Sequence, residues 1–405
     1  MLVENNYPQD PRVRNEATLL TSVGYDVTVI ALRKEGQPPT DMVHGIRVYR
    51  VPRLELFAKT ALGASGGVPR LLLKVKSCIG YLVEHAYFTA ACFVVTLAVL
   101  VRHGFDVIHA HNPPDTLFLV ALPFKYFGKK FVFDHHDLCP ELYRSRYRTG
   151  EDVLARLLRL VEWYSLRLSD ITIATNESYK SAQIERAKKE ASKVFVVRNG
   201  PDLERMTPVV CNPRLRGMNK SILCYIGSLN PQDGVDYLLR SLHHLLRALK
   251  RDDFHCVIMG TGDSLGDLRA LAAELQLAGH VELTGFVSDE ELAANLAAAD
   301  ICVDPDPSSP LNDVSTWIKI MEYMAYGKPI VSFDLKETRV SAGDAALFVT
   351  PNDEAAFAEA IVTLMDDPGL RASMGDLGRQ RVEKELQWSV VGGNLLAAYR
   401  SLAAQ

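Results

Sequence analysis

Short runs of β-branched and apolar residues alternate with longer amphipathic stretches along most of this 405-residue chain. Such alternation predicts parallel strands joined by crossover helices. Apart from a brief apolar run at residues 1–4, the predicted strands of the first half begin at Asp26, Asp106, Lys130, Asp170 and Val194. Those of the second half begin at Ser221, His255, His280, Asp300 and Pro329. The pattern therefore predicts two doubly wound α/β units.

The segment from Asn199 to Lys220 is rich in proline, glycine and asparagine, as a linker between domains would be. A chain of this length is also expected to form two domains of about 200 residues each. We therefore place the domain boundary near residue 205.

Polar residues and glycines follow several of the predicted strands, where open parallel sheets bind ligands. They are His109, His111, His135, His136, Asp137, Gly260, Gly262, Asp304 and Asp306. If two such sheets face each other across a cleft, these residues are expected to meet there.

The stretch "KIMEYMAYGKP" places Glu322 inside an otherwise apolar helical segment that ends at Gly327. Ser315 or Thr316 is the predicted N-cap, and Lys319 lies in the first turn, where a cation is unfavourable unless an anion binds there. Helical spacing puts Ser315, Lys319 and Glu322 on one face, which predicts a ligand with phosphate and hydroxyl groups. The alternative is a solvated Lys319–Glu322 pair.

A second helix start shows the same charge pattern. Asp10 and Pro11 are a predicted N-cap and first helical residue, and Arg12 and Arg14 follow in the first turn. The two arginines indicate either an anion site or ordinary surface charge.

Four further motifs could have a functional role. His136 follows a strand and can polarise a substrate hydroxyl, or it is a structural histidine. The alternating His109 and His111 have a spacing that suits a metal. The "DPD" motif at Asp304 and Asp306 could hold a divalent cation on a diphosphate, although its prolines also fit a turn. "GTGD" at residues 260–263 fits close backbone approach by a ligand, but the chain has no strict GxGxxG.

Composition narrows the class of protein. The apolar fraction of 48%, the charged fraction of 23% and the net charge of −4 are typical of a soluble enzyme and favour no nucleic acid partner. The seven scattered cysteines include no CxxC pair, so we expect a reducing cytoplasm. Glu4, Asn5 and Asn6 interrupt the apolar residues at the start, and no signal peptide is expected.

The segment from His85 to Val101 is slightly short of the roughly 20 apolar residues that span a bilayer. We therefore favour a buried core helix. The alternative is a helix in peripheral contact with a membrane over residues 70–101, because Arg70, Lys74 and Lys76 lie just upstream among leucines.

These motifs, taken together, give the chain a family resemblance. The stretches that carry it are "DPRVRNEATLLTSVGYDVTVI", "HAHNPPD", "VVRNGPDLERM", "MGTGDSLGDLRALA", "HVELTGFVSDEEL" and "STWIKIMEYMAYGKPIVSFD". In their order and place, they resemble glycosyltransferase family 4, the retaining nucleotide-sugar enzymes of GT-B fold. The resemblance implies an acceptor-side Rossmann-like domain over residues 1–205, a nucleotide-sugar-binding one over 206–380, and a helix in 381–405 that returns to the first domain.

The resemblance also implies roles for individual residues. Glu322 is similar to the family's second glutamate, which binds the ribose hydroxyls, and His136 to the histidine beside the reacting sugar. Lys319 is the third residue expected to take part in catalysis. The nucleotide sugar is expected to contact Gly227, Gly260, Gly262, Phe286, Val287, Asp313, Ser315, Thr316, Lys319 and Glu322. The acceptor or an anion is expected near Arg12, Arg14, His111, Asp137 and Asn199.

The chain departs from the family pattern at three positions. Val314 stands eight residues before Glu322, where the first glutamate is expected, and Asp313 is one residue away from that place. Ser228 and Asp233 stand where the family has its diphosphate-binding arginine and lysine.

The sequence thus predicts a retaining glycosyltransferase that moves a sugar from a nucleotide diphosphate to a hydroxyl in glycan, polysaccharide or glycolipid synthesis. We expect a uridine diphosphate sugar as donor, no metal or other cofactor, a lipid-linked acceptor, and a cytoplasmic location at the inner face of the membrane. One alternative is an inactive sugar-nucleotide-binding or partner subunit of the same fold. A remote alternative is a metal-dependent hydrolase that uses His109, His111, His136 and Asp137.

Overall fold

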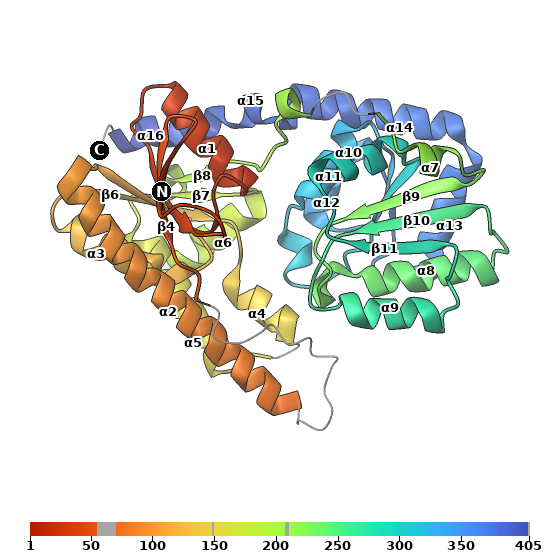
Figure 1. The fold of residues 1–405 in the computed structure, drawn as a ribbon, viewed down its shortest axis with the longest axis horizontal. Helices are drawn as coiled ribbons and strands as arrows, with labels where there is room; N and C mark the ends of the chain where they lie inside the picture. Colours follow the sequence, from red (N-terminus) through yellow and green to blue (C-terminus); the bar gives the residue numbers. More distant parts are fainter. Residues whose placement is uncertain (55–69, 148–149, 207–209, 404–405) are drawn as a thin grey trace. The chain divides into compact units, whose positions relative to one another are not determined.

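The computed structural model describes residues 1–54, 70–147, 150–206 and 210–403 (Figure 1). Their contacts divide the chain into two compact units. The first unit holds the described residues of 1–54, 70–199 and 391–403, and the second holds those of 200–390. The boundaries predicted from the sequence pattern and the family resemblance lie near residues 205 and 380.

The first unit is built on an eight-stranded sheet with the order β3-β4-β2-β1-β5-β6-β7-β8. Its strands are β1 (Leu2–Asn6), β2 (Thr28–Leu32), β3 (Thr40–Val43), β4 (Ile46–Val51), β5 (Val107–His111), β6 (Lys130–His135), β7 (Ile171–Ala174) and β8 (Val194–Val196). Neighbouring strands are parallel except β3 and β4, which form an antiparallel pair.

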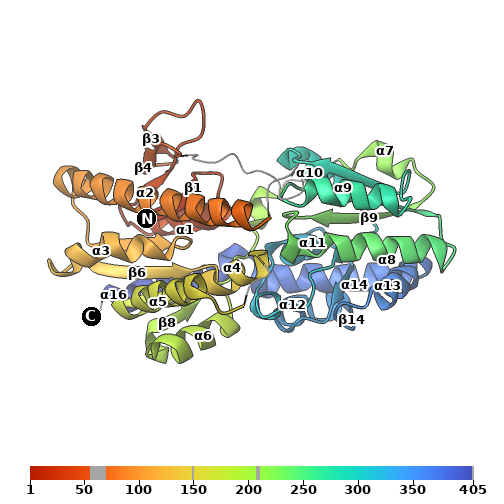
Figure 2. The same cartoon turned by 90° about the horizontal axis from the view of Figure 1, so that it is seen from below.

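Helices cover both faces of this sheet. They are α1 (Pro11–Ser22), α2 (Arg70–His103), α3 (Phe118–Lys125), α4 (Cys139–Tyr147), α5 (Val153–Leu168), α6 (Glu177–Ala187) and α16 (Gly393–Ala403), with the 3-10 turns η1 (Asp115–Leu117) and η2 (Ala191–Lys193). Helices α2, α3 and α5 lie along one face, and α1 and α16 lie along the other (Figures 1 and 2).

The side chains of β5 alternate between these two faces, because successive residues of a strand point in opposite directions. Ile108 and Ala110 join a core cluster with Phe88 of α2 and Phe131 of β6. The residues between them, His109 and His111, therefore point toward α1 and α16. As a result, the polar side chains of β5 lie on one face of the sheet, and its apolar side chains pack into the core on the other face.

Helix α2 is apolar on both its buried and its exposed side. Phe88, Cys92 and Val99 belong to the core, but most other described side chains of the helix are partly or fully exposed, so the favoured prediction of a buried core helix holds for one side only. The part from Gly80 to His103 is also long and apolar enough to cross a membrane, by length and composition only; its mean hydropathy is 1.7, and 28% of the window is buried. Membrane contact remains a prediction, and the side chains of Arg70, Lys74 and Lys76 lie outside the described part.

The second unit has a six-stranded parallel sheet with the order β11-β10-β9-β12-β13-β14. Its strands are β9 (Ser221–Ile226), β10 (Phe254–Met259), β11 (Val281–Gly285), β12 (Ile301–Asp304), β13 (Ile330–Phe333) and β14 (Ala346–Val349). Tyr225 and Leu223 pack on one face with α8 and α13, and Cys224 and Ile226 pack on the other with α11. The sheet is thus buried on both faces, as an all-parallel sheet usually is.

The helices of the second unit follow the strands. They are α7 (Pro213–Arg216), α8 (Val235–Arg247), α9 (Leu265–Glu274), α10 (Asp289–Ala298), α11 (Ile318–Ala325), α12 (Lys336–Ala342), α13 (Glu354–Asp366), α14 (Pro368–Arg381) and α15 (Trp388–Val391), which reaches the boundary. Short turns complete it: η3 (Leu203–Arg205), η4 (Pro231–Asp233), η5 (Asn312–Val314), η6 (Gly343–Ala345) and the π-turn η7 (Val382–Leu386).

Candidate functional site

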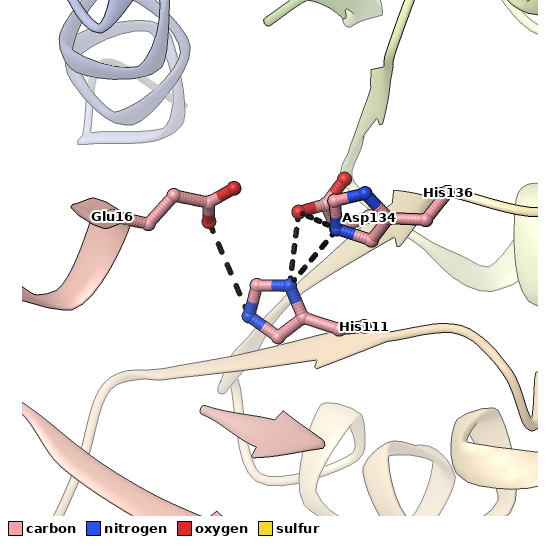
Figure 3. A group of neighbouring side chains, drawn as sticks. All are labelled: Glu16, His111, Asp134 and His136. Atoms are coloured by element: carbon pink, nitrogen blue, oxygen red, sulfur yellow. Dashed lines mark hydrogen bonds and ion pairs between the residues drawn. The ribbon is translucent and has the colours of Figure 1, made fainter. Parts of the chain in front are cut away.

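A buried polar cluster lies at the carboxyl ends of β5 and β6 in the first unit (Figure 3). Asp134 is its centre. The Asp134 Oδ2 atom lies 2.9 Å from His136 Nε2, 3.0 Å from His111 Nδ1 and 3.5 Å from His109 Nε2. From α1, Glu16 Oε2 lies 3.7 Å from His109 Nε2 and 4.0 Å from His111 Nε2.

Burial and close contact set the charges of this cluster. Burial raises the pKa of Glu16 well above its usual range, and the nearby Asp134 raises it further. Burial also acts to raise the pKa of Asp134, but the contacts with His136, His109 and His111 hold that pKa well below its usual value. Burial lowers the pKa of His111 to about 3. The cluster therefore contains one ionised carboxylate, that of Asp134, surrounded by imidazoles. Such an arrangement can bind a proton or a cation.

Asn112 fixes the loop that carries His136. Its Oδ1 accepts hydrogen bonds from the backbone N–H groups of His136, at 2.6 Å, and Asp137, at 3.1 Å. The predicted residues His111 and His136 are thus brought together, with Nδ1 and Nε2 3.3 Å apart. Asp137 is outside the cluster, whereas Asp134 and Glu16, which were not predicted, belong to it.

The start of α1 has the predicted cap. Asp10 accepts a hydrogen bond from the Arg12 N–H, and Pro11 is the first helical residue. The Arg12 guanidinium turns back to Asp10 at 2.8 Å, and Arg14 Nη1 donates to the Pro8 carbonyl at 3.3 Å. Both arginines therefore have local partners, and an anion would have to compete with them. Asn199, half-buried, is the last residue of this part of the unit.

In the second unit, the loops after β9 and β10 need glycine because two backbones touch. A Cβ atom on Gly260 would lie 1.8 Å from the Gly227 carbonyl oxygen, and one on Gly262 would lie 2.3 Å from the Leu229 carbonyl oxygen. Gly227 and Gly260 also have φ angles of 149° and 148°. Packing between loops thus accounts for these glycines without a ligand. Farther along, Val287 is half-buried and Phe286 is 84% exposed.

The predicted start of the Glu322 helix was wrong. Helix α11 begins at Ile318, and Trp317 is its N-cap without a side-chain hydrogen bond. The Ser315 hydroxyl is used by the preceding turn, because it donates to the Leu311 carbonyl at 2.8 Å. Thr316 lies between that turn and the helix and is half-buried.

Lys319 points toward two aspartates that follow or end β12. Its Nζ atom lies 2.9 Å from Asp304 Oδ1 and 2.6 Å from Asp306 Oδ2. It also lies 4.8 Å from the centre of the Tyr225 ring and 5.6 Å from that of Trp317. Burial opposes its charge, but the two aspartates hold the pKa of Lys319 well above its usual range. The cation at the "DPD" motif is thus the ammonium group of Lys319.

Glu322 lies one turn along α11 and is half-buried. Burial, with a contribution from Asp289, raises the pKa of Glu322 to about 7. In the described part of the chain, the ion pairs of Lys319 are with Asp304 and Asp306 rather than with Glu322. Asp313, the nearest match to the missing first glutamate, accepts hydrogen bonds from the Ser308 hydroxyl at 3.0 and 3.1 Å.

Asp233 has a structural task at the position where a cation was expected. Its carboxylate caps the turn η4 by accepting a hydrogen bond from the Asn230 N–H at 2.8 Å. A Cβ atom on the next residue, Gly234, would lie 2.1 Å from the Pro305 carbonyl oxygen, so this loop lies close to the "DPD" motif. Burial raises the pKa of Asp233 to about 6. Two buried carboxylates, Asp304 and Asp306, thus contact the Lys319 ammonium group, and that group also acts to lower the pKa of the third, Asp233.

Two family models match the chain, one for each half. "Glycosyltransferase Family 4" matches residues 12–205, and "Glycosyl transferases group 1" matches residues 220–367.

Two curated relatives are named as glycosyltransferases. A phosphatidyl-myo-inositol mannosyltransferase of Mycobacterium leprae is 28% identical over 311 residues, which is 75% of each chain. An alpha-D-kanosaminyltransferase of Streptomyces kanamyceticus is 27% identical over 186 residues, 45% of this chain and 46% of that enzyme. The alignment thus spans only about half of this second relative.

Two solved structures show the fold. The sucrose-phosphate synthase of Thermosynechococcus elongatus has a TM-score of 0.74 at 20% identity, over 99% of this chain and 95% of that one. The Anabaena protein Alr3699/HepE, solved in complex with UDP-glucose, has a TM-score of 0.69 at 16% identity, over 100% and 98%. The chain belongs to glycosyltransferase family 4 and has the GT-B fold.

Proposed function

We propose that this protein is a retaining glycosyltransferase that moves a sugar from a nucleotide diphosphate to a hydroxyl acceptor. The observation that carries the proposal is Glu322, a half-buried carboxylate at the position that matches the family's ribose-binding glutamate. A carboxylate that is ionised can accept short, strong hydrogen bonds from the two ribose hydroxyls.

In this reaction, the bond from the anomeric carbon to the diphosphate oxygen breaks, and the acceptor oxygen bonds to the same face of that carbon. The acceptor proton passes to the departing diphosphate, so no side-chain base is needed. We assign His136 to a hydroxyl of the reacting sugar and Lys319 to the charge on the diphosphate. No metal is required, and chelation by EDTA is expected not to lower the rate.

The donor that we propose is a uridine diphosphate sugar, because a structure of the same fold was solved with UDP-glucose. The acceptor that we propose is lipid-linked, since a relative is named for a phosphatidyl-inositol acceptor and α2 exposes apolar side chains. We place the protein in the cytoplasm, in peripheral contact with the inner face of the membrane through α2.

One observation favours a second candidate, an inactive sugar-nucleotide-binding or partner subunit. Lys319 is already paired with Asp304 and Asp306, and Asp233 puts a further carboxylate where the family has a cation. A diphosphate would meet less positive charge here than in the family pattern.

A panel of nucleotide sugars, including UDP-glucose, UDP-N-acetylglucosamine and GDP-mannose, tests the proposal in thermal-shift and hydrolysis assays. A ligand at 100 times its Kd stabilises the native state by about 2.7 kcal/mol. We expect one donor to stabilise the protein and to be hydrolysed slowly, and Glu322→Gln to weaken its binding. Binding without turnover of any donor and acceptor would favour the inactive subunit, and no binding at all would refute both.

A further inference from the structure

The cluster around Asp134 has more buried polar atoms than its hydrogen bonds satisfy. Within the described residues, Asp134 Oδ1 and His136 Nδ1 have no hydrogen-bond partner. Asp134 Oδ2 and Glu16 Oε2 contact the imidazoles of the cluster. All four residues of the cluster, Glu16, His111, Asp134 and His136, are at least nine-tenths buried. Buried polar atoms without partners are rare in native proteins and need an explanation.

We propose that Glu16, His111, Asp134 and His136 form a binding site for a first-row divalent metal ion of the zinc class. Each residue offers one ligand atom, and these four atoms lie within 4.8 Å of one another (Figure 3). The elements that place them are α1, β5 and β6 with the residue after it, so the site is held by the scaffold of the first unit.

The spacing of three of these atoms is that of ligands on one face of a metal. Asp134 Oδ2, His111 Nδ1 and His136 Nε2 form a triangle with sides of 2.9, 3.0 and 3.3 Å. Metal–ligand bonds of about 2.0–2.1 Å place neighbouring ligand atoms about 2.9 Å apart in octahedral and about 3.4 Å apart in tetrahedral geometry. The observed sides lie within this range, and Glu16 approaches as the fourth ligand.

The types of ligand atom in the four side chains indicate which metals the site would prefer. Two imidazoles and two carboxylates suit zinc, cobalt or iron(II), whereas magnesium and calcium prefer oxygen ligands alone. A divalent ion would also balance the charge of the fully buried Asp134 and that of Glu16, which would lose its proton to the solvent on binding the metal.

A bound metal would be coordinated by Nε2 of His136, and this residue could then no longer contact the substrate. This consequence rests on the proposed function, which assigns His136 to the reacting sugar. The metal is therefore an inhibitor of transfer rather than a cofactor, and it would act at one equivalent per chain.

Binding of Zn²⁺ and Co²⁺ to the metal-stripped full-length protein tests the site without any need for activity. We expect one equivalent of zinc after desalting, and a visible absorption band when Co²⁺ is added. Glu16→Gln is the main variant, because the amide has the shape of the neutral acid that burial favours. It should weaken the affinity for Zn²⁺ by more than about 100-fold, since even loss of an outer partner costs 10–100-fold. His111→Ala is a second variant with the same expected loss.

His103→Ala is the matched control, because His103 is exposed and lies on α2 outside the cluster. It should bind Zn²⁺ like the wild type. The proposal is overturned if the wild type retains less than half an equivalent of zinc, or if Glu16→Gln and His111→Ala bind as tightly as His103→Ala. If transfer is detected, Zn²⁺ should inhibit the wild type and spare a Glu16→Gln variant that is active; if no transfer is found, the binding results still decide the site.

Discussion

The ammonium group of Lys319 is enclosed by its own chain, and this changes how its role can be measured. It lies within 2.9 Å of Asp304 and 2.6 Å of Asp306, and all three side chains are buried. Burial, together with the charge of Asp304, raises the pKa of Asp306 well above its usual range, so Asp304 is the carboxylate that keeps its charge. Removal of Lys319 would leave that charge buried without a countercharge, with the Ser332 hydroxyl, which donates to Asp304 Oδ2 at 2.9 Å, still in place.

We therefore expect Lys319→Ala to destabilise the protein by about 3–5 kcal/mol, the usual cost of breaking a buried ion pair from one side. Denaturant unfolding measures the change. Lys336→Ala, at an exposed lysine of the next helix, is the control and should change stability by less than about 0.5 kcal/mol. A loss below about 1 kcal/mol for Lys319→Ala would show that the ion pair contributes little. Loss of turnover in Lys319→Ala has to be corrected for unfolded protein.

The role of Glu322 can be tested through the pH dependence of stability, because its pKa of about 7 lies above the usual 4.5. A raised carboxyl pKa means that folding disfavours the charged form, and this penalty grows between pH 4.5 and pH 7 and is constant above it. Glu322→Gln cannot ionise and should be more stable than the wild type at pH 8, by at most about 3 kcal/mol. At pH 4 the two proteins should be equally stable.

The same titration should appear in donor binding with the opposite sign, because the ionised carboxylate accepts the ribose hydroxyls. Calorimetry with UDP-glucose, whose diphosphate does not titrate near neutrality, should show about tenfold weaker binding at pH 6 than at pH 8 in the wild type. Glu322→Gln should show no such change. An equal pH dependence in both proteins would remove Glu322 from the donor site.

At the scale of the elements, the sequence predicts those whose pattern is local. Each predicted parallel strand is present, because a β-branched run between turn residues needs only its own neighbours to be recognised. The antiparallel strands β3 and β4 and the edge strand β14 were not predicted. β3 reads "TDMV", is mostly exposed and has no apolar alternation, so only its pairing with β4 defines it.

In the candidate site, too, the residues placed by local sequence patterns could be predicted and those placed by tertiary packing could not. His111 and His136 could be predicted because parallel strands end at one edge of a sheet. Glu16 could not, because its place beside them depends on how α1 packs on the sheet. The start of α11 was wrong for a related reason: Ser315 is a good cap by residue type, but its hydroxyl completes η5, which the sequence pattern does not reveal.

At the scale of the whole molecule, the described surface is unevenly apolar. Most of its exposed large apolar side chains lie on α2, on α3 and the turn after it, and on α5, helices that lie along one face of the first unit (Figure 2). On α2 they include Val94 at 65%, Leu97 at 40% and Val101 at 86% exposed. α5 adds Trp163 beside exposed arginines. Aromatic and basic side chains around an apolar face are typical of proteins that bind a membrane surface.

Co-sedimentation of the full chain with vesicles of phosphatidylglycerol and phosphatidylcholine tests whether this face binds lipid. We expect binding, and we expect Val94→Ser with Leu97→Ser to weaken it by about 3 kcal/mol, roughly 100-fold, because two apolar side chains leave the lipid. Val340→Ser, at a valine that is 45% exposed in the second unit, should bind like the wild type. If the wild type does not bind, or if the double variant binds equally well, α2 is not a lipid-binding element. The affinity for the nucleotide sugar should be the same in all three proteins. This control distinguishes a loss of lipid binding from unfolding of the variant.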